Sequence, residues 1–157
     1  MEGPSINRTY RPSILVVEND PIVASYVKEI LVEAEYRVAG VASSASEALA
    51  LLGQDRPDLA IVDVGLTGPL DGIELARLMR IKAQVPTIFL SGWTDARTKS
   101  KAAAAQPLAF LDKPFAPSTL FNAVEEAACM TNGFTNPDSG NLPDASLPPP
   151  GDTAANC

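Results

Sequence analysis

Short runs of strand character alternate with segments of helical periodicity along most of this chain. The runs that predict strands lie at residues 14–17, 36–42, 59–62, 87–90 and 108–111. Between them, apolar residues recur every three or four positions, as in a helix that buries one face. This alternation is typical of parallel strands joined by crossover helices. With right-handed crossovers it predicts an α/β fold: a doubly wound five-stranded parallel sheet with five helices, in three α/β/α layers.

Capping residues mark where the predicted helices begin and end. Asp20 and Pro21 supply an N-cap and a proline at the first helical position. Ser44 or Ser46 can cap the second helix in the same way. Gly53 can end that helix, since glycine readily adopts the left-handed conformation found at helix C-termini.

The 157 residues predict one domain flanked by two tails. Residues 1–12 show no periodicity, and residues 131–157 are dominated by Pro, Gly, Asn, Asp, Ser and Thr. Such segments cannot bury enough apolar surface to offset the cost of ordering, so both are expected to be disordered. The ordered domain is therefore placed at residues 13–130. Because no Lys or Arg follows Lys113, no DNA-binding output module is expected.

Charge and composition exclude several classes of function. Twelve basic and nineteen acidic residues give a net charge of -7, the wrong sign for tracking a phosphate backbone, so no nucleic-acid partner is expected. The absence of histidine excludes imidazole metal ligands and histidine-activated nucleophiles. No apolar run approaches the roughly 18 residues of a membrane helix, so no membrane partner is expected. The two cysteines form no zinc or disulfide pattern, which fits a cytoplasmic protein.

Polar side chains directly follow four of the predicted strands. They are Glu18, Asn19 and Asp20 after the first strand, Asp63 after the third, Ser91 after the fourth and Lys113 after the fifth. The carboxyl ends of parallel strands share one edge of a sheet, where ligands of doubly wound folds collect. Acidic oxygens there suit Mg²⁺, while a hydroxyl and an ammonium can hold phosphate oxygens. The chemistry that this indicates is phosphoryl transfer to Asp63 as the nucleophile.

Four sequence segments carry a family resemblance: ILVVENDP, DLAIVDVGLTGPLDG, PTIFLSGW and FLDKPF. Together they resemble the signatures of the receiver domain of two-component response regulators, which has a flavodoxin-like fold. The resemblance implies that Asp63 is the phosphoacceptor, Ser91 the switch hydroxyl, Lys113 the conserved lysine and Phe110 the switch aromatic residue. It also implies a cis peptide bond between Lys113 and Pro114.

The resemblance further implies a Mg²⁺ site formed by Glu18, Asn19, Asp63 and the backbone carbonyl of Gly65. Asn19 departs from the family pattern, because it stands where the second acidic ligand is usual. An amide still ligates, but without the charge of a carboxylate, so weak Mg²⁺ binding is expected. Asp20, next in the chain, is interpreted mainly as a helix cap, with a substitute role as metal ligand as the alternative.

The function expected from this resemblance is that of a single-domain response regulator in a phosphorelay. A sensor histidine kinase or histidine phosphotransfer protein would phosphorylate Asp63, and the signal would pass to a downstream protein target. The chain would be a phosphoprotein that assists its own phosphorylation and dephosphorylation, not an enzyme. One alternative is a receiver-like interaction module that is not phosphorylated because of Asn19. Another, a haloacid-dehalogenase-type phosphatase, would need a second acid where Gly65 stands.

Three basic residues on the predicted fourth helix lie near this site in the sequence. Arg97, Lys99 and Lys101 are interpreted as part of a solvated helix face. Trp93 is expected to cover the site from its loop.

Overall fold

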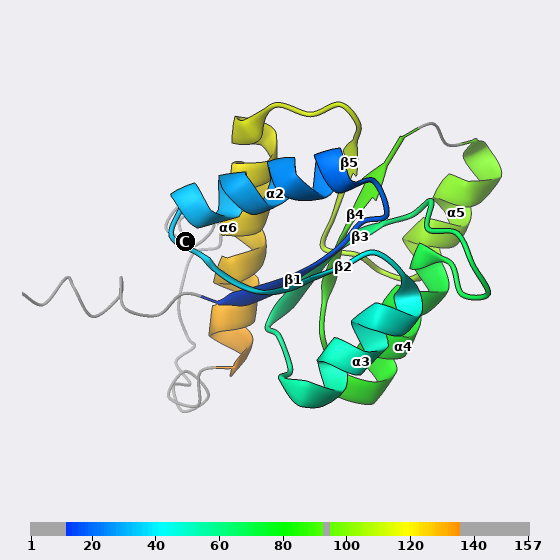
Figure 1. The fold of residues 1–157 in the computed structure, drawn as a ribbon, viewed down its shortest axis with the longest axis horizontal. Helices are drawn as coiled ribbons and strands as arrows, with labels where there is room; N and C mark the ends of the chain where they lie inside the picture. Colours follow the sequence, from blue (N-terminus) through cyan, green and yellow to red (C-terminus); the bar gives the residue numbers. More distant parts are fainter. Residues whose placement is uncertain (1–11, 93–94, 136–157) are drawn as a thin grey trace, which may run out of the picture.

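The computed structural model describes residues 12–92 and 95–135, in which strands and helices alternate in the predicted order (Figure 1). The strands are β1 (Ser13–Val17), β2 (Arg37–Ala42), β3 (Leu59–Asp63), β4 (Thr87–Ser91) and β5 (Ala109–Asp112). The helices are α2 (Pro21–Glu33), α3 (Ala45–Gln54), α4 (Gly72–Ala83), α5 (Ala96–Ala104) and α6 (Pro117–Thr135). All strand pairs are parallel, in the order β2-β1-β3-β4-β5. The predicted fold is confirmed.

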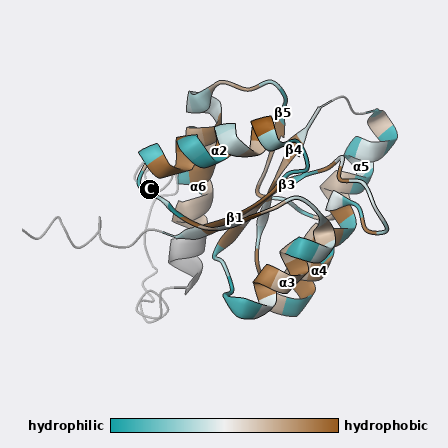
Figure 2. Cartoon of the chain, viewed as in Figure 1, coloured by the Kyte–Doolittle hydropathy of each residue, from teal (hydrophilic) through white to brown (hydrophobic). Residues whose placement is uncertain are grey.

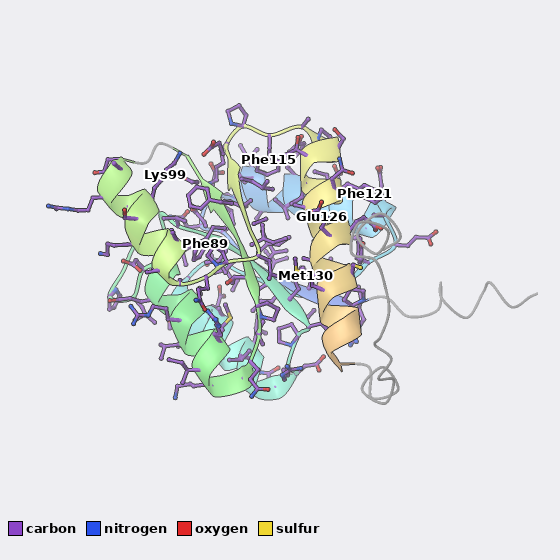
Figure 3. The ribbon with its side chains drawn as sticks, turned by 180° about the vertical axis from the view of Figure 1, so that it is seen from behind. Phe89, Lys99, Phe115, Phe121, Glu126 and Met130 are labelled. Atoms are coloured by element: carbon purple, nitrogen blue, oxygen red, sulfur yellow. The ribbon has the colours of Figure 1, made fainter. Side chains whose placement is uncertain are left out.

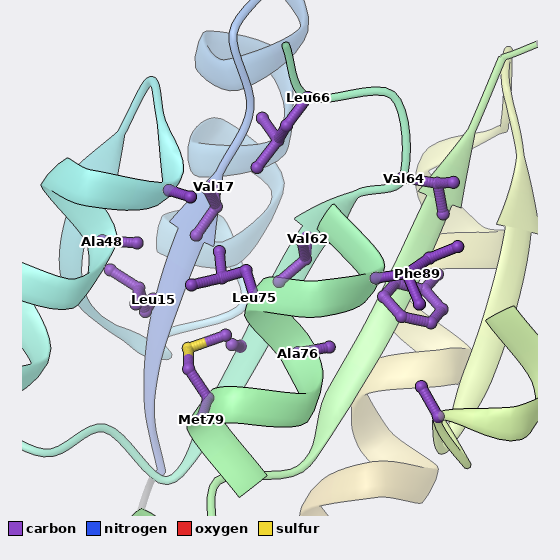
Figure 4. Close-up of a cluster of buried hydrophobic side chains, with 14 of the residues drawn as sticks. Leu15, Val17, Ala48, Val62, Val64, Leu66, Leu75, Ala76, Met79 and Phe89 are labelled. Carbon is purple, nitrogen blue, oxygen red and sulfur yellow. The ribbon is translucent and has the colours of Figure 1, made fainter. Parts of the chain in front are cut away.

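Alternate residues of the central strands pack against opposite layers of helices. On β1, Leu15 and Val17 face the layer of α3, α4 and α5, whereas Ile14 and Val16 face the layer of α2 and α6. All five residues of β1, of β3 and of β4 are buried, as expected for strands covered on both faces. Figure 2 shows the hydrophobic strands between amphipathic helices, and Figure 4 shows one of the two cores, with Met79 and Phe89 among its larger side chains.

Side-chain caps fix the first turn of four helices. Asp20 accepts a hydrogen bond from the backbone N–H of Ile22 at the start of α2, with Pro21 at the first helical position. Ser44, not Ser46, caps α3. Asp71 and Asp95 cap α4 and α5 in the same way. Because each cap satisfies an otherwise unpaired N–H, these polar residues set the points at which the chain leaves the sheet edge.

The strand order places a topological switch point between β1 and β3. The chain passes from β1 to β2 on one side and then crosses to β3 on the other side. In this class of fold, the crevice beyond the strand ends at such a point is where ligands bind. Glu18 follows β1 and Asp63 ends β3, so the two predicted acidic site residues lie at this crevice.

The structure differs from the expectations in a few places. Gly53 lies inside α3, which ends at Gln54 because the backbone of Asp55 turns to an extended conformation. Helix α6 runs to Thr135, five residues past the predicted end of the ordered domain. Cys129 on α6 is disulfide-bonded, which was not expected; sequence spacing alone does not show a contact made through tertiary structure. Trp93 and the residues beyond 135, including Cys157, lie outside the described residues.

The length and apolar content of the described helices show whether any of them could span a membrane. None of them combines the length and the apolar content needed to cross a bilayer.

Candidate functional site

The acceptor carboxylate predicted from the sequence is buried at the end of β3. Asp63 is only 4% exposed. The next residue, Val64, donates its N–H to the carbonyl of Leu90 on β4 at 2.8 Å, which continues the strand pairing past Asp63. Asp63 Oδ1 accepts the N–H of Gly65 at 2.9 Å. The side chain is therefore held at the sheet edge by its own loop.

Lys113 joins the two carboxylates of the crevice. Its Nζ lies 3.0 Å from Glu18 Oε1 and 3.4 Å from Asp63 Oδ1. The backbone N–H of Lys113 donates to the carbonyl of Ser91 at 2.6 Å, so the end of β5 is fixed against the end of β4. The Lys113–Pro114 peptide bond is cis, as the resemblance implied. The structure thus brings Glu18, Asp63, Ser91 and Lys113 to one edge of the sheet.

The segment that follows Lys113 is tied to helix α2. Tyr26 donates its hydroxyl hydrogen bond to the carbonyl of Phe115 at 3.0 Å, and the two rings lie 5.7 Å apart. Figure 3 shows Phe115 beside the start of α6. These contacts hold the loop that carries Lys113 against the layer of α2 and α6.

Glu18 is a buried carboxyl whose pKa is raised. Its side chain has no exposed surface, and burial raises its pKa above the ordinary value of 4.5. The hydrogen bond from Lys113 and the N–H of Asp20 lower the pKa, while the charge of Asp63 raises it. Oε2 accepts the Asp20 N–H at 3.1 Å. Oε1 is buried without a well-aligned hydrogen bond, and Lys113 provides its neighbouring charge.

This raised pKa predicts a pH dependence of folding stability. The folded chain keeps the Glu18 proton to higher pH than the unfolded chain, so the free energy of unfolding should fall as pH rises from about 4.5 through the raised pKa. Glu18→Gln should flatten this part of the profile. Chemical denaturation between pH 4 and 7 in buffer with a metal chelator measures it. Glu29→Gln, an exposed change on α2, serves as the control and should leave the profile unaltered.

Asn19 and Asp20 differ in what they do beside Glu18. Both are exposed. Asp20 accepts the Ile22 N–H at 2.9 Å and so is used as the cap of α2, in agreement with its interpretation from the sequence. Among the described residues, no group of three or more acidic, histidine or cysteine side chains is placed to hold a metal ion. Asn19 adds no carboxylate to the two buried ones, Glu18 and Asp63.

A pocket of about 450 Å³ opens beside Asp63. Its lining includes the predicted residues Asp63, Ser91 and Lys113 at the strand ends, and also Asp71, Thr98 and Lys101. The last three were not predicted from the sequence. The sequence feature that could have indicated Thr98 and Lys101 is their spacing of three residues, which puts both on one face of α5.

Gly72, at the first position of α4, lies against the backbone of Asp63. A Cβ atom at this position would lie 2.1 Å from the carbonyl oxygen of Asp63 and 3.0 Å from the Cα of Val64. Glycine is therefore required by space, because the start of α4 packs directly on the backbone of the acceptor. The segment PLDG contains this glycine, but the sequence does not reveal the close approach.

Phe110 on β5 is half-buried and packed from two sides. Its ring meets Phe89 edge-on, with 6.2 Å between the ring centroids, and Lys99 Nζ lies 5.8 Å from its centroid. Figure 3 shows Lys99 and Phe89 on the α5 side of the molecule. Arg97, Lys99 and Lys101 are all exposed, as expected, yet Lys99 also contacts Phe110 and Lys101 also lines the pocket.

The sequence of this chain is similar to those of known signalling proteins. Residues 14–125 match the model of the response regulator receiver domain. The transcriptional regulatory protein PdtaR of Mycobacterium tuberculosis is 32% identical over 122 residues, which are 78% of this chain but 59% of that protein. This chain therefore spans about three fifths of the length of that relative.

Solved structures give the same result. The signal receiver domain of a modulated diguanylate cyclase from Desulfovibrio desulfuricans is 32% identical, with a TM-score of 0.74 over 78% of this chain and 98% of that chain. A CheY-like response regulator receiver domain protein from Methanospirillum hungatei is 24% identical, with a TM-score of 0.73 over 80% and 99% of the two chains. The second similarity supports the fold alone.

Proposed function

Because this chain belongs to the response regulator receiver domain family, we propose that it accepts a phosphoryl group on Asp63 from a histidine kinase or a histidine phosphotransfer protein. The observation that carries the proposal is the buried carboxylate of Asp63, held within 3.4 Å of Lys113 Nζ and open to a pocket. Membership of this family argues against the phosphatase alternative.

The nucleophile follows from the contacts of the carboxylate. Asp63 Oδ1 accepts the Gly65 N–H and lies next to Lys113. Since Oδ1 is engaged by these two groups, we assign the attack on phosphorus to the other carboxylate oxygen, Oδ2. As the bond from Oδ2 to phosphorus forms, the bond from phosphorus to the imidazole nitrogen of the donor breaks, and that nitrogen keeps the electron pair. Lys113 stabilises the negative charge that gathers on the phosphoryl oxygens.

The oxygen donors of the crevice fit Mg²⁺, although they carry few charges. The carboxylates of Glu18 and Asp63, the carbonyl of Gly65 and the amide of Asn19 are all ligand types that this ion accepts. The buried Oε1 of Glu18, without a well-aligned hydrogen bond, is suited to such a ligand role. When bound, Mg²⁺ would neutralise phosphoryl charge. With two carboxylates present, we expect weak binding.

Asn19→Asp should therefore strengthen Mg²⁺ binding by at least about tenfold, or roughly 1.4 kcal/mol, since a third carboxylate joins the site. The estimate is modest because removing water from the new carboxylate offsets part of the attraction. The Mg²⁺ affinities of the native chain and of Asn19→Asp are measured by titration, with the fluorescence emission of Trp93 as the signal. Trp93 is the chain's single tryptophan and lies two residues after Ser91.

Asp20→Asn is the matched control for this titration. Asparagine caps helices as well as aspartate does, so the variant removes a neighbouring charge and keeps the start of α2. Its Mg²⁺ affinity should change by less than about threefold. If it binds far more weakly while Asn19→Asp changes nothing, Asp20 is the ligand and the assignment of Asn19 is wrong.

We further propose that phosphorylation acts on other proteins through the face of α5, β5 and α6, within the cytoplasm. Ser91 ends β4 beside Asp63, and Phe110 lies one strand away on β5. A phosphoryl group that draws Ser91 toward it would shift β4 relative to β5 and change the packing of Phe110.

The second candidate function is a receiver-like module that is not phosphorylated. The exposed, uncharged Asn19 favours it, because weak metal binding slows transfer. Incubation of the chain with acetyl phosphate and excess Mg²⁺, followed by intact mass measurement, distinguishes the two. One phosphoryl group per chain supports the receiver function. No incorporation, even by Asn19→Asp with its added carboxylate, supports the interaction module.

A further inference from the structure

The pocket beside Asp63 contains a second lysine, supplied by helix α5. Lys101 and Thr98 lie one turn apart on α5, and both line the pocket with Asp63, Ser91 and Lys113. Figure 1 shows α5 beside the ends of β3 and β4. Lys101 therefore reaches the site from a different layer than Lys113, which comes from the end of β5.

The two lysines differ in their electrostatic surroundings. Lys113 is engaged by two carboxylates, Glu18 and Asp63, which offset its charge. Within the described part of the chain, no carboxylate lies within ion-pair distance of Lys101. Asn19 contributes no charge of either sign. Asp71, the other carboxylate of the pocket lining, caps α4 and forms no ion pair with Lys101. The ammonium of Lys101 is thus not paired with a carboxylate of the lining, and an anion entering the pocket is attracted to it.

We propose that Lys101 is a phosphoryl-binding residue of this chain, which holds the incoming phosphoryl group from the α5 side of the pocket. The inference rests on the proposed function, since it assigns a further substrate contact to the same site. With Lys101 on the α5 wall and Lys113 at the β5 end, the oxygens of the phosphoryl group lie between two ammonium groups. Such placement lowers the cost of bringing an anion close to the Asp63 carboxylate.

The ligand class that this predicts is a small anionic phosphodonor such as an acyl phosphate. With acetyl phosphate, the bond from Asp63 Oδ2 to phosphorus forms while the bond from phosphorus to the acetate oxygen breaks. Acetate leaves with the electron pair. Lys101 acts on binding of the donor, so its removal should raise the donor concentration needed for half-maximal rate more than it lowers the maximal rate.

Binding of inorganic phosphate tests the contact without any transfer step. Phosphate is titrated at constant ionic strength while the amide resonances of Gly92 and Thr98 are followed by NMR. Lys101→Gln should weaken binding threefold to fivefold, on the order expected for a partly exposed charge pair. Lys101→Arg should stay within about twofold of the native chain, because the charge is kept.

Arg97→Gln is the matched control, because it removes one positive charge from the same helix at a residue outside the pocket lining. It should change phosphate affinity by less than about twofold. Equal weakening by Arg97→Gln and Lys101→Gln would show a general field effect and overturn the proposal. Unchanged affinity in Lys101→Gln, or no measurable phosphate binding by the native chain, would overturn it as well.

Phosphorylation by acetyl phosphate separates this inference from the proposed function. If the native chain takes up no phosphoryl group, the proposed function fails, while the phosphate titrations still decide the role of Lys101. If the native chain is phosphorylated and Lys101→Gln shows an unchanged half-saturating concentration, the role of Lys101 is wrong and the proposed function stands.

Discussion

Asp63→Asn should abolish phosphorylation by acetyl phosphate, because the amide oxygen and nitrogen cannot replace the attacking carboxylate oxygen. The native chain should gain one phosphoryl group, and the variant none, in an intact mass measurement with Mg²⁺. The fold should persist, since asparagine has the same shape and its oxygen can still accept the N–H of Gly65. Lys113 keeps its ion pair with Glu18 in the variant, so no large loss in the free energy of unfolding is expected.

Asp71→Asn provides the matched control. Asp71 also lines the pocket, but its side chain caps α4 through the N–H of Glu74 at 2.9 Å. Asparagine caps equally well, so this variant should still be phosphorylated. Label on Asp63→Asn, or label mapped by peptide mass to Glu18 or Asp20, would show that another carboxylate is the acceptor.

Gly72→Ala should have the largest effect on stability. The new Cβ would lie 2.1 Å from the carbonyl oxygen of Asp63, so either α4 or the end of β3 must move. Overpacking of this kind costs about 1–3 kcal/mol, which at this domain size lowers the melting temperature by roughly 4 °C per kcal/mol. Displacement of the Asp63 backbone should also slow phosphorylation.

Gly53→Ala is the control for this substitution. A Cβ at Gly53, inside α3, has no atom within 4 Å, and alanine favours the helix over glycine by about 0.5–1 kcal/mol. The melting temperature should therefore stay equal or rise. If Gly72→Ala has the same melting temperature as Gly53→Ala and is phosphorylated at the native rate, then α4 does not pack on the acceptor as described.

The chemistry of the site depends on a balance between burial and charge. Glu18 and Asp63 are both buried, and a buried charge without a partner is costly. Lys113 offsets this cost by lying within 3.4 Å of both carboxylates. The negative oxygens of an incoming phosphoryl group are repelled by the same carboxylates. The positive charges of Lys113 and Lys101 reduce this repulsion.

Much of this protein was determined by features that are local in the sequence. Apolar runs such as 14–17, the cap formed by Asp20 and Pro21, and the cap at Ser44 depend on contacts within a few residues. The sequence also predicted the site residues, because parallel strands end at one edge of a sheet. These residues are Glu18, Asp63, Ser91 and Lys113. The strand ends therefore predicted which side chains would meet.

The tertiary structure alone decided how these side chains meet. The ion pairs of Lys113, the contact of Gly72 with the Asp63 backbone, and the presence of Lys101 in the pocket join segments that are distant in the chain. Such contacts depend on how closely each helix approaches the sheet and on which face it turns inward. Periodicity shows that a helix has an apolar face, but the packing of its neighbours sets its distance from the sheet to within an ångström. That distance makes glycine necessary at residue 72 and places an α5 lysine in the lining of the acceptor's pocket.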